Sequence, residues 1–419
     1  MFHTLYIISY ICIMYKVPTY QEAVSLTIGR RYVAEVNQYL DAAFYEAKFV
    51  LDGYNVSVFN YRLADYKDFN ENDAFEIRGL VYVFDHDGSY KTYRLLHKFF
   101  NLNQVDETQY SNVKNRKVKS VYSKEDGSVG SFIKLPNGKV IAKSKMSFES
   151  DQALGMMSIY QSNQEIKDFI NWSLDNDLVA VFEYVAPHNR IVLRYTNEEL
   201  ILLRLRNNST GEYLDLDDYK DRIGDIKTAV KYDYTLDELV EMCKCVEDME
   251  GWVVDLDGLF VKMKTAWYFS LHGLLTNDLY RENKLIGYII DEQIDDVISQ
   301  IPEDDKESHT RVENIVLLVK QAVVEKSADI LKSYDLFLEG GVGKDYEGEF
   351  RLQLMRKTFA INYRKDPNFG YVMSLSKGAD VYDLAKDWVS GQTKKLKIAR
   401  EFLQNRDSSF SFSDIEDDE

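Results

Sequence analysis

The sequence predicts an α+β protein, in which antiparallel sheets with flanking helices form a body that is followed by an all-helical C-terminal domain. Short apolar runs separated by Asp-Gly and Asn-Gly pairs predict the sheets, because such pairs favour the tight turns of hairpins. Apolar residues spaced three or four apart fill most of the chain after residue 275, which predicts helices. We therefore expect a body over 1–275, a helical domain over 276–407 and a disordered acidic tail over 408–419.

Within the body, helical and extended segments alternate. Helical spacing of apolar residues is expected over 17–50, and strands with turns follow over 56–140 in the pattern of a β-meander. Two turns of this meander are expected at Asp126-Gly127 and Asn137-Gly138. The same patterns predict a helix over 150–174, strands over 178–184, 191–195 and 200–205, a helix over 236–249, and a hairpin over 251–263 that turns at Asp257-Gly258.

The composition excludes several classes of protein. The 419 residues include 51 Lys and Arg against 69 Asp and Glu, so the net charge is −18. This acidity argues against a protein that coats nucleic acid through bulk charge, but it permits a local basic site. Three cysteines are too few for a disulfide framework, and the C-x-C pair of Cys243 and Cys245 lacks the partners of a zinc site, so we expect a reducing, cytoplasmic location. No segment predicts a membrane span.

The sharpest local motif is Ser123-Lys124-Glu125-Asp126-Gly127-Ser128, in which a strand delivers Lys124 to an Asp-Gly turn. A lysine becomes a good nucleophile when burial or neighbouring cations lower its pKa, and a pocket walled by strands and rich in other lysines supplies both conditions. Taken alone, the motif is equally consistent with a solvated lysine in an ordinary hairpin.

Further motifs follow Lys124 in the chain. Their order is that of the nucleotidyltransferase motifs in covalent ligases and capping enzymes, namely K-x-D-G, a strand glutamate, an E-G-hydrophobic strand and K-x-K. In this chain K-x-D-G is the Lys124 motif, and Lys143-Ser144-Lys145 follows it. The strand glutamate is in Val181-Phe182-Glu183-Tyr184-Val185, the E-G strand begins in Met249-Glu250-Gly251-Trp252, and K-x-K is in Val261-Lys262-Met263-Lys264. Each motif is weak alone, but their occurrence in this order is a specific signal.

Each motif has a physical rationale and a competing structural explanation. Lys262 and Lys264 alternate on a strand, so both point to one face and can neutralise a triphosphate, although a solvated strand face would also explain them. Glu183 and Glu250 lie in apolar strand contexts, where an unpaired carboxylate is costly. They can hold hydrated Mg²⁺ or ribose hydroxyls, or form buried ion pairs with lysine. Phe182 can stack on adenine or pack in the core.

Flanking segments extend the pattern. Glu76-Ile77-Arg78-Gly79 and Lys98-Phe99-Phe100-Asn101-Leu102 precede the lysine motif, and Ala186-Pro187-His188-Asn189-Arg190-Ile191-Val192 follows the strand glutamate. The ensemble closely resembles the bacteriophage RNA ligase 1 family, with a thermophilic-phage member as one candidate. The resemblance is strong over about 56–272 and weak over the helical tail.

This resemblance implies a nucleotidyltransferase fold and three chemical steps. Lys124 would attack the α-phosphorus of ATP to form lysyl-AMP, AMP would pass to a 5′-phosphate, and a 3′-hydroxyl would displace AMP to seal the strand. Lys264 would be the second catalytic residue. The implied nucleotide-binding residues are Arg78, Lys98, Lys143, Lys145, Phe182, Glu183, Glu250, Lys262, Lys264 and Tyr268. The residues implied for binding Mg²⁺ through waters are Asp126, Glu183 and Glu250, and Mn²⁺ is an alternative metal. The helical pair Asp295 and Asp296 is also implied, although a solvated helix face would explain this pair as well.

The implied partner is single-stranded RNA with 5′-phosphate and 3′-hydroxyl ends, and nicked tRNA and single-stranded DNA are further candidates. The resemblance also implies a role in RNA repair, and we expect a monomer without membrane contact, in the host cytoplasm if a phage encodes it. Two alternatives remain open: another lysyl-nucleotidyltransferase, such as a capping enzyme or DNA ligase, or an idle RNA-binding module. The absence of an OB-fold pattern after K-x-K favours the RNA ligase.

The acidity is unevenly distributed along the chain. Residues 112–147, around Lys124, contain nine Lys or Arg and only two acidic residues, whereas 291–306 and 408–419 are strongly acidic. The sequence therefore predicts a local phosphate-binding site on a chain that repels nucleic acid elsewhere.

Overall fold

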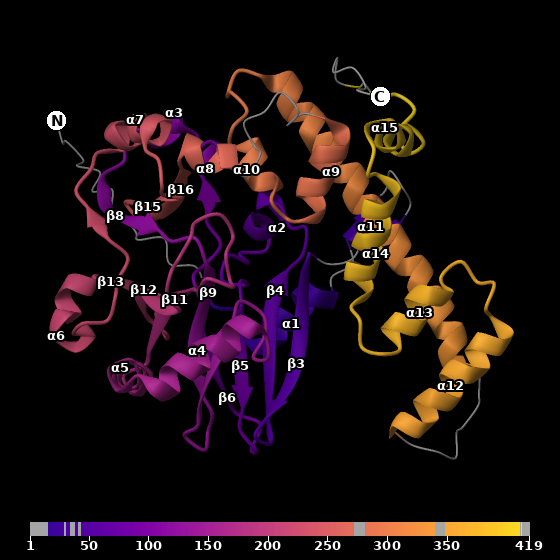
Figure 1. Cartoon of the computed structure of the whole chain (residues 1–419), viewed down its shortest axis with the longest axis horizontal. Helices are drawn as coiled ribbons and strands as arrows, with labels where there is room; N and C mark the ends of the chain where they lie inside the picture. The colour runs from indigo at the N-terminus through magenta and orange to yellow at the C-terminus, as the bar shows by residue number, and fades with distance from the viewer. Residues whose placement is uncertain are drawn as a thin grey trace, which may run out of the picture. The chain divides into compact units, whose positions relative to one another are not determined.

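A computed structural model describes residues 16–28, 31–33, 38–40, 43–271, 281–339, 348–410 and 412 (Figure 1). It is a mixed α+β structure with antiparallel sheets and a helical C-terminal region, so the predicted fold class is confirmed. The chain divides into two compact units, of which the first is Met1–Arg30 with Ala42–Thr276 and the second is Arg31–Asp41 with Asn277–Glu419. The second unit includes the short strands β1 (Arg31–Val33) and β2 (Gln38–Leu40).

A four-stranded antiparallel sheet of the first unit has the order β3-β4-β5-β6. Its strands are β3 (Phe44–Leu51), β4 (Tyr54–Tyr61), β5 (Leu80–Phe84) and β6 (Tyr90–Tyr93), and helices α1 (Tyr20–Ile28) and α2 (Tyr66–Glu71) accompany it. The helix predicted over 17–50 is therefore wrong beyond α1. Phe44–Leu51 pairs along its whole length with β4 across the Asp52-Gly53 turn, and this pairing overrides its helical spacing.

Two five-stranded sheets form the rest of the first unit. One has the order β10-β9-β11-β12-β13, and the other has the order β14-β8-β15-β16-β7. The strands are β7 (Phe100–Asn101), β8 (Val118–Lys124), β9 (Ser128–Lys134), β10 (Val140–Ser144), β11 (Leu178–Val185), β12 (Glu199–Asn207), β13 (Tyr213–Leu214), β14 (Lys231–Tyr232), β15 (Gly251–Leu256) and β16 (Leu259–Lys264). Only the β16–β7 pair is parallel among the pairs of the described strands.

The turn pairs had different outcomes. Hairpins at Asn137-Gly138 and Asp257-Gly258 are confirmed, because β9 pairs with β10 and β15 pairs with β16. The turn at Asp126-Gly127 does not close a hairpin, since β8 and β9 belong to different sheets. The chain crosses from one five-stranded sheet to the other at this point, so the predicted continuous meander is wrong here.

The helices of the first unit cover the sheets and close their connections. They are α3 (Tyr110–Val113), α4 (Asp151–Ser162), α5 (Gln164–Asp175), α6 (Lys220–Ile223), α7 (Leu236–Cys245) and α8 (Ala266–Leu271). The single helix predicted over 150–174 is two helices, because the Asn163 side chain accepts a hydrogen bond from the backbone of Ile166 and starts α5 anew. The main core lies between the sheet of β9 to β12 and helices α4 and α5.

The described part of the second unit after residue 280 is helical. Its helices are α9 (Glu282–Ile290), α10 (Ile294–Ile298), α11 (Lys306–Glu339), α12 (Gly348–Asn362), α13 (Phe369–Leu375), α14 (Val381–Gln392) and α15 (Leu396–Gln404). The start of the predicted tail is packed, since Phe410 is buried and Phe412 contacts the Arg400 guanidinium. Within the described ranges, no helix combines the length and apolar character needed to cross a membrane.

Candidate active site

Lys124 is the last residue of β8, where the chain passes between the two five-stranded sheets. Gly251, the first residue of β15, pairs with Lys124 on one side and with Lys264 of β16 on the other. Residues from three separate motifs therefore lie side by side in one sheet, as the strand pairing requires. Glu183 of β11 reaches the same place from the other sheet, because its carboxylate accepts a hydrogen bond from the Gly127 backbone N–H at 3.1 Å.

Two glycines make this junction possible. A Cβ on Gly127 would lie 2.4 Å from the carbonyl oxygen of Tyr184, so only glycine lets the two sheets approach this closely. Gly251 has a φ of +147°, and its Cβ would lie 1.9 Å from the carbonyl oxygen of Met263. The Glu-Gly of the E-G-hydrophobic motif is thus a backbone requirement as well as a chemical signal.

The Glu250 carboxylate joins two lysines. One oxygen accepts a hydrogen bond from Lys124 Nζ at 2.9 Å, and the other lies 3.2 Å from Lys264 Nζ. Glu250 is only 3% exposed, whereas Lys124 is 23% exposed. A buried carboxylate between two ammonium groups is compensated in charge and holds both amines in place, while Lys124 keeps access to solvent.

Burial controls the protonation of the second carboxylate, Glu183. It raises the pKa of Glu183 from 4.5 to about 8, against the opposing effect of Lys124 and with some support from Glu250. A pKa near 8 means that both the neutral and the ionised form of Glu183 occur within the physiological pH range. The ionised form lowers the positive charge of the site.

A pH dependence of stability follows from this shift. Between about pH 5 and pH 7, Glu183 is protonated in the folded protein and ionised in the unfolded chain, so folding takes up a proton and a rise in pH works against the folded state. We expect Glu183→Gln to make the free energy of unfolding fall less between these pH values than it does in the wild type. Urea unfolding of both nucleotide-free proteins checks this, and equal pH slopes would contradict it.

Asp126 holds the crossover together. Its carboxylate accepts hydrogen bonds from the Tyr268 hydroxyl at 2.7 Å and from the backbone N–H groups of Val192 and Leu193 at 2.8 and 2.6 Å. These bonds explain why the strand predicted over 191–195 is absent, because a side chain occupies the backbone donors that a strand would use. They show that Asp126 positions a loop, and its predicted metal role stays a prediction.

Tyr195 is a residue of this turn that the sequence reasoning did not single out. Its hydroxyl accepts a hydrogen bond from the Asp126 backbone N–H and donates one to Glu125. The Tyr195 pKa is raised, chiefly by burial, so the phenol stays a neutral donor. An isolated tyrosine in a loop carries no sequence signal that would have revealed this contact.

The bond from Tyr268 to Asp126 gives a second testable expectation. Tyr268→Phe removes a buried hydrogen bond to a carboxylate but keeps the ring beside Lys264, whose Nζ lies 5.1 Å from the ring centroid. We expect the free energy of unfolding to fall by about 2 kcal/mol. Tyr232→Phe is a matched control, because it keeps the ring that stacks on Tyr234. It should change the free energy of unfolding much less. Equal losses in the two variants would contradict this role of Tyr268.

A second group of cations lies around Arg78. Lys143 is fully buried, its Nζ donates to the carbonyl oxygen of Gly79 at 3.0 Å, and burial together with Arg78 lowers its pKa to about 7. Arg78 also acts electrostatically on Glu183, which places these three side chains in one neighbourhood. Among the described residues Arg78 makes no ion pair, and its guanidinium forms one long hydrogen bond to the Leu96 carbonyl oxygen. An anion would relieve this excess of positive charge.

A buried ion cluster positions the segment that carries Arg78. Glu76 is almost fully buried between the guanidinium groups of Arg94 and Arg206. Arg206 also donates to the Leu95 carbonyl, and Arg94 donates to Asn208 and Ser209. Two arginines that share one carboxylate and fill their remaining donors make a rigid anchor for the turn at Gly79.

Two further predicted cations share an aromatic wall. Lys98 is buried, and its Nζ lies 5.1 Å from the Tyr61 ring centroid and 5.0 Å from that of Phe100. Lys145 lies 5.1 Å from the same Tyr61 ring. Cation–π contacts stabilise such charges without neutralising them.

Four further predicted residues have the following positions. Phe182 is fully buried in the core with its edge toward Phe132, and strand alternation points it away from Glu183, so its predicted stacking on adenine is corrected to core packing. Asp295 and Asp296 lie in α10 of the second unit. Lys262 is half-buried on β16, beside Asn101 of β7.

The donor set fits a hydrated metal ion better than a dedicated metal cage. Among the described residues no group of three or more His, Cys, Asp or Glu side chains is arranged to hold a metal ion. Glu183 and Glu250 are two carboxylates beside a cluster of phosphate-seeking cations. Mg²⁺ characteristically keeps several waters and binds through one or two carboxylates plus substrate phosphates, which matches this set.

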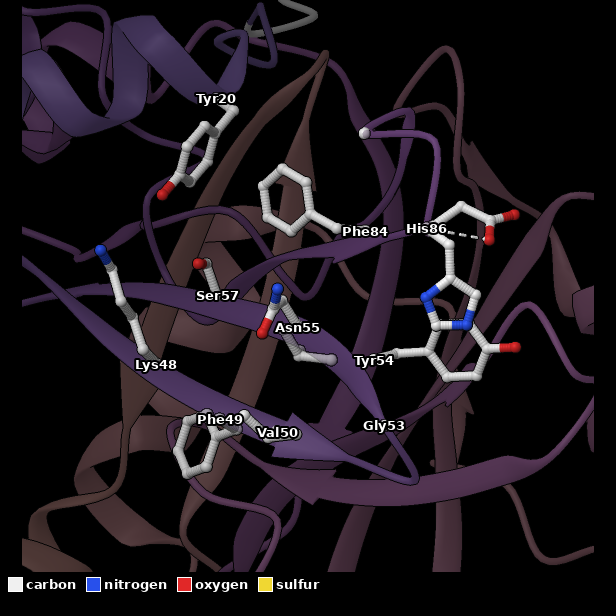
Figure 2. Close-up of a pocket in the computed structure, with 13 residues that line it drawn as sticks. Tyr20, Lys48, Phe49, Val50, Gly53, Tyr54, Asn55, Ser57, Phe84 and His86 are labelled. Atoms are coloured by element: carbon white, nitrogen blue, oxygen red, sulfur yellow. Dashed lines mark hydrogen bonds between the residues drawn. The ribbon is translucent and has the colours of Figure 1, made fainter.

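A hollow of about 670 Å³ lies on the four-stranded sheet, away from these residues (Figure 2). Aromatic rings from Tyr20, Phe49, Phe84 and the stacked Tyr54–His86 pair line it, and Lys48 reaches in from β3. None of the predicted site residues lines this hollow. We therefore do not assign this hollow as the active site, although it is large enough for a ligand.

Comparisons with known proteins found similarity to RNA ligases. Residues 76–272 match a family described as RNA ligase, and this segment contains Arg78, Lys124, Glu183, Glu250 and Lys264. A Thermovibrio ammonificans protein carries the description RNA ligase. It is 26% identical to this chain over 312 residues, which cover 69% of this chain and 79% of that protein.

Solved structures show only distant similarity. Two forms of an archaeal ATP-dependent RNA ligase are each 12% identical, with TM-scores of 0.41 and 0.42. The first covers 80% of this chain and 93% of its own, and the second covers 87% and 96%. A Naegleria gruberi RNA ligase variant with ATP and Mn is 15% identical with a TM-score of 0.35, covering 43% of this chain and 58% of its own. Because these scores are low, the similarity to RNA ligases depends on the sequence matches.

Proposed function

We propose, from the match of residues 76–272 to the RNA ligase family, that the chain is an ATP-dependent ligase that joins a 5′-phosphate to a 3′-hydroxyl of single-stranded RNA. The observation that carries this proposal is the cluster in which Glu250 joins Lys124 to Lys264 at the crossing of two sheets. An accessible lysine with a buried carboxylate partner and surrounding cations is what lysyl-nucleotide chemistry needs.

In the first step, the Lys124 Nζ lone pair attacks the α-phosphorus of ATP. A nitrogen–phosphorus bond forms, the bond from the α-phosphorus to the bridging oxygen breaks, and pyrophosphate leaves with that electron pair. The protons that the Lys124 ammonium loses in this step pass to solvent or to pyrophosphate. Arg78, Lys143, Lys145 and Lys264 would neutralise the charge that develops on the phosphates. Lys98 and Lys262 would extend this cationic surface.

A divalent cation, Mg²⁺ or Mn²⁺, would be held through waters by Glu183 and Glu250, and it would supply charge neutralisation on the phosphates when bound. Binding of the cation should favour the ionised form of Glu183, whose pKa is raised by burial in its absence. This gives Glu183 a role that its burial alone would not explain.

In the later steps AMP passes from Lys124 to the 5′-phosphate of RNA, and the 3′-hydroxyl then displaces AMP to leave a phosphodiester. Repair of broken RNA, nicked tRNA included, is the role that fits this reaction. A capping enzyme or a DNA ligase is the second candidate. Among the described residues only helices follow Lys264, which favours the RNA ligase.

The experiment is ligation of a 5′-phosphorylated oligoribonucleotide with ATP and Mg²⁺, read as circular product on a denaturing gel. We expect circles with ATP and none with GTP. Covalent labelling of the protein by GTP instead of ATP would favour capping. Binding of RNA without labelling by either nucleotide would make the protein an idle binding module.

A further inference from the structure

A groove of about 540 Å³ lies beside the strand that ends in Lys124. Its walls are the start of β8, the loop that precedes it, and the segment from β14 to the first turn of α7. Helices α3 and α7 lie at the same end of the unit as β8 (Figure 1), and Val113, Val121 and Leu236 pack there in one core cluster. The groove therefore lies beside a packed core cluster.

One wall of the groove is cationic. Lys114, Arg116 and Lys119 line it, and Lys117 is adjacent in the loop. Lys119 is paired with Asp257 at 3.0 Å. The other three are exposed, and within the described part of the chain they form no ion pair. In a protein with a net charge of −18, unpaired cations gathered beside one groove point to an anionic ligand.

The other wall is aromatic. The rings of Tyr232 and Tyr234 are stacked, with centroids 5.4 Å apart and planes 17° apart, and both side chains are partly exposed. Two acidic residues, Asp233 and Asp237, also line this wall, and Asp237 accepts a hydrogen bond from Tyr110. Cations along one side and stacked rings on the other are the combination that binds single-stranded nucleic acid, since phosphates follow the cations and bases stack on the rings.

The groove is connected to the candidate nucleophile through strand pairing. Tyr232 pairs with Val121, and Lys231 pairs with Tyr122. Next along the chain, Ser123 donates from its backbone N–H to the Val230 carbonyl oxygen, and its hydroxyl accepts from the Val230 N–H. At about 3.3 Å per residue, Lys124 lies roughly 10 Å along β8 from the position opposite Tyr232. A strand of RNA in the groove would thus need only a few nucleotides to reach Lys124.

We propose that this groove binds the single-stranded RNA substrate, with Lys114, Arg116 and Lys117 on its phosphates and Tyr232 and Tyr234 stacked on its bases. The proposal rests on the RNA ligase function and adds to it the surface that receives the RNA. It requires that binding of RNA depends on the groove, whereas transfer of AMP to Lys124 does not.

The test measures the binding of a 5′-phosphorylated, 3′-blocked oligoribonucleotide of about 12 nucleotides by fluorescence anisotropy at several salt concentrations. We expect the double variant Lys114→Ala/Arg116→Ala to raise Kd about 10-fold and to reduce the salt slope by about 1.4, because each lost phosphate contact contributes about 0.7 on single strands. Tyr234→Leu, which keeps an apolar side chain, should raise Kd about 10-fold with little change in slope. The matched control Lys67→Ala/Lys220→Ala removes two exposed cations that do not line the groove.

Labelling with α-labelled ATP in the absence of RNA separates the two levels of the proposal. Groove variants that label as the wild type does, yet bind RNA weakly with the expected change in slope, support the groove. Unchanged RNA binding, or an equal loss in the Lys67/Lys220 control, overturns it. If the wild type binds RNA through the groove but is not labelled, the ligase function fails and the groove stands. A groove variant can also lose labelling. In that case Tyr234→Phe, which keeps the ring, must retain both labelling by ATP and binding of RNA. Loss of RNA binding in Tyr234→Phe would overturn the stacking role.

Discussion

Replacing Lys124 by alanine should reduce covalent labelling of the protein by α-labelled ATP to background. Lys124 supplies the nitrogen to which AMP would be bonded, and no other lysine of the cluster can take its place. Lys264 is 10% exposed and held by Glu250, and Lys143 is fully buried. Removal of a covalent nucleophile costs on the order of 10⁶-fold in rate in a well-studied protease, so the loss here should be complete within detection.

Lys124→Arg is the matched variant for this prediction. It keeps a cation beside Glu250 and so preserves the buried ion pair, but a guanidinium does not lose its proton and cannot attack phosphorus. We expect it to fold with near wild-type stability and to give no label. Label in either variant, after any bound AMP has been removed, would mean that another residue carries the nucleotide.

Gly251→Ala should lower the free energy of unfolding by at least about 3 kcal/mol. The added Cβ would lie 1.9 Å from the Met263 carbonyl oxygen, a backbone atom that cannot move without breaking the pairing of β15 and β16. The φ of +147° adds strain for any residue with a side chain. Because Gly251 lies between Lys124 and Lys264, labelling should fall together with stability.

Gly138→Ala is the control for the effect of a positive φ alone. Gly138 has a φ of +87° in a hairpin turn, and nothing lies within 4 Å of where its Cβ would be. Its replacement should cost only about 1 kcal/mol, the usual penalty of the left-handed region. Urea unfolding of the two variants checks the comparison, and similar losses would show that close packing at Gly251 is not what requires glycine there.

The sequence was most informative where local chemistry and structure agree. Turn pairs such as Asn137-Gly138 and Asp257-Gly258 predicted hairpins correctly, because their backbone preference is local. The segment over 44–51 was predicted wrongly, because its spacing of apolar residues suits a helix while its pairing with β4 is decided by distant residues. A long range predicted as one helix, 150–174, contained a cap at Asn163 that splits it.

The candidate site could be predicted as a set of residues but not as a geometry. The spacing of Lys124, Glu183, Glu250 and Lys264 pointed to one chemistry, and these residues meet at the crossing of the two sheets. Strand alternation alone could have separated Phe182 from Glu183, since neighbours on a strand face opposite sides.

Other features of the site depend on contacts that no local pattern encodes. The hydrogen bonds of Asp126 to Tyr268, Val192 and Leu193 join segments far apart in the chain, so its role in holding the loop was invisible in the sequence. The same holds for Tyr195, and for the tyrosine wall of the groove beside β8, which faces a cationic loop more than a hundred residues earlier.

The central claim is that Lys124 carries AMP, and peptide mapping by mass spectrometry tests it most directly. The protein is incubated with ATP and Mg²⁺ without RNA, digested at neutral or alkaline pH to preserve the nitrogen–phosphorus bond, and searched for the mass of an added AMP. We predict the adduct on the peptide that contains Lys124 and its disappearance when RNA with a 5′-phosphate is added. An adduct on Lys264 or another lysine, or no adduct on protein freed of bound nucleotide, would contradict the account.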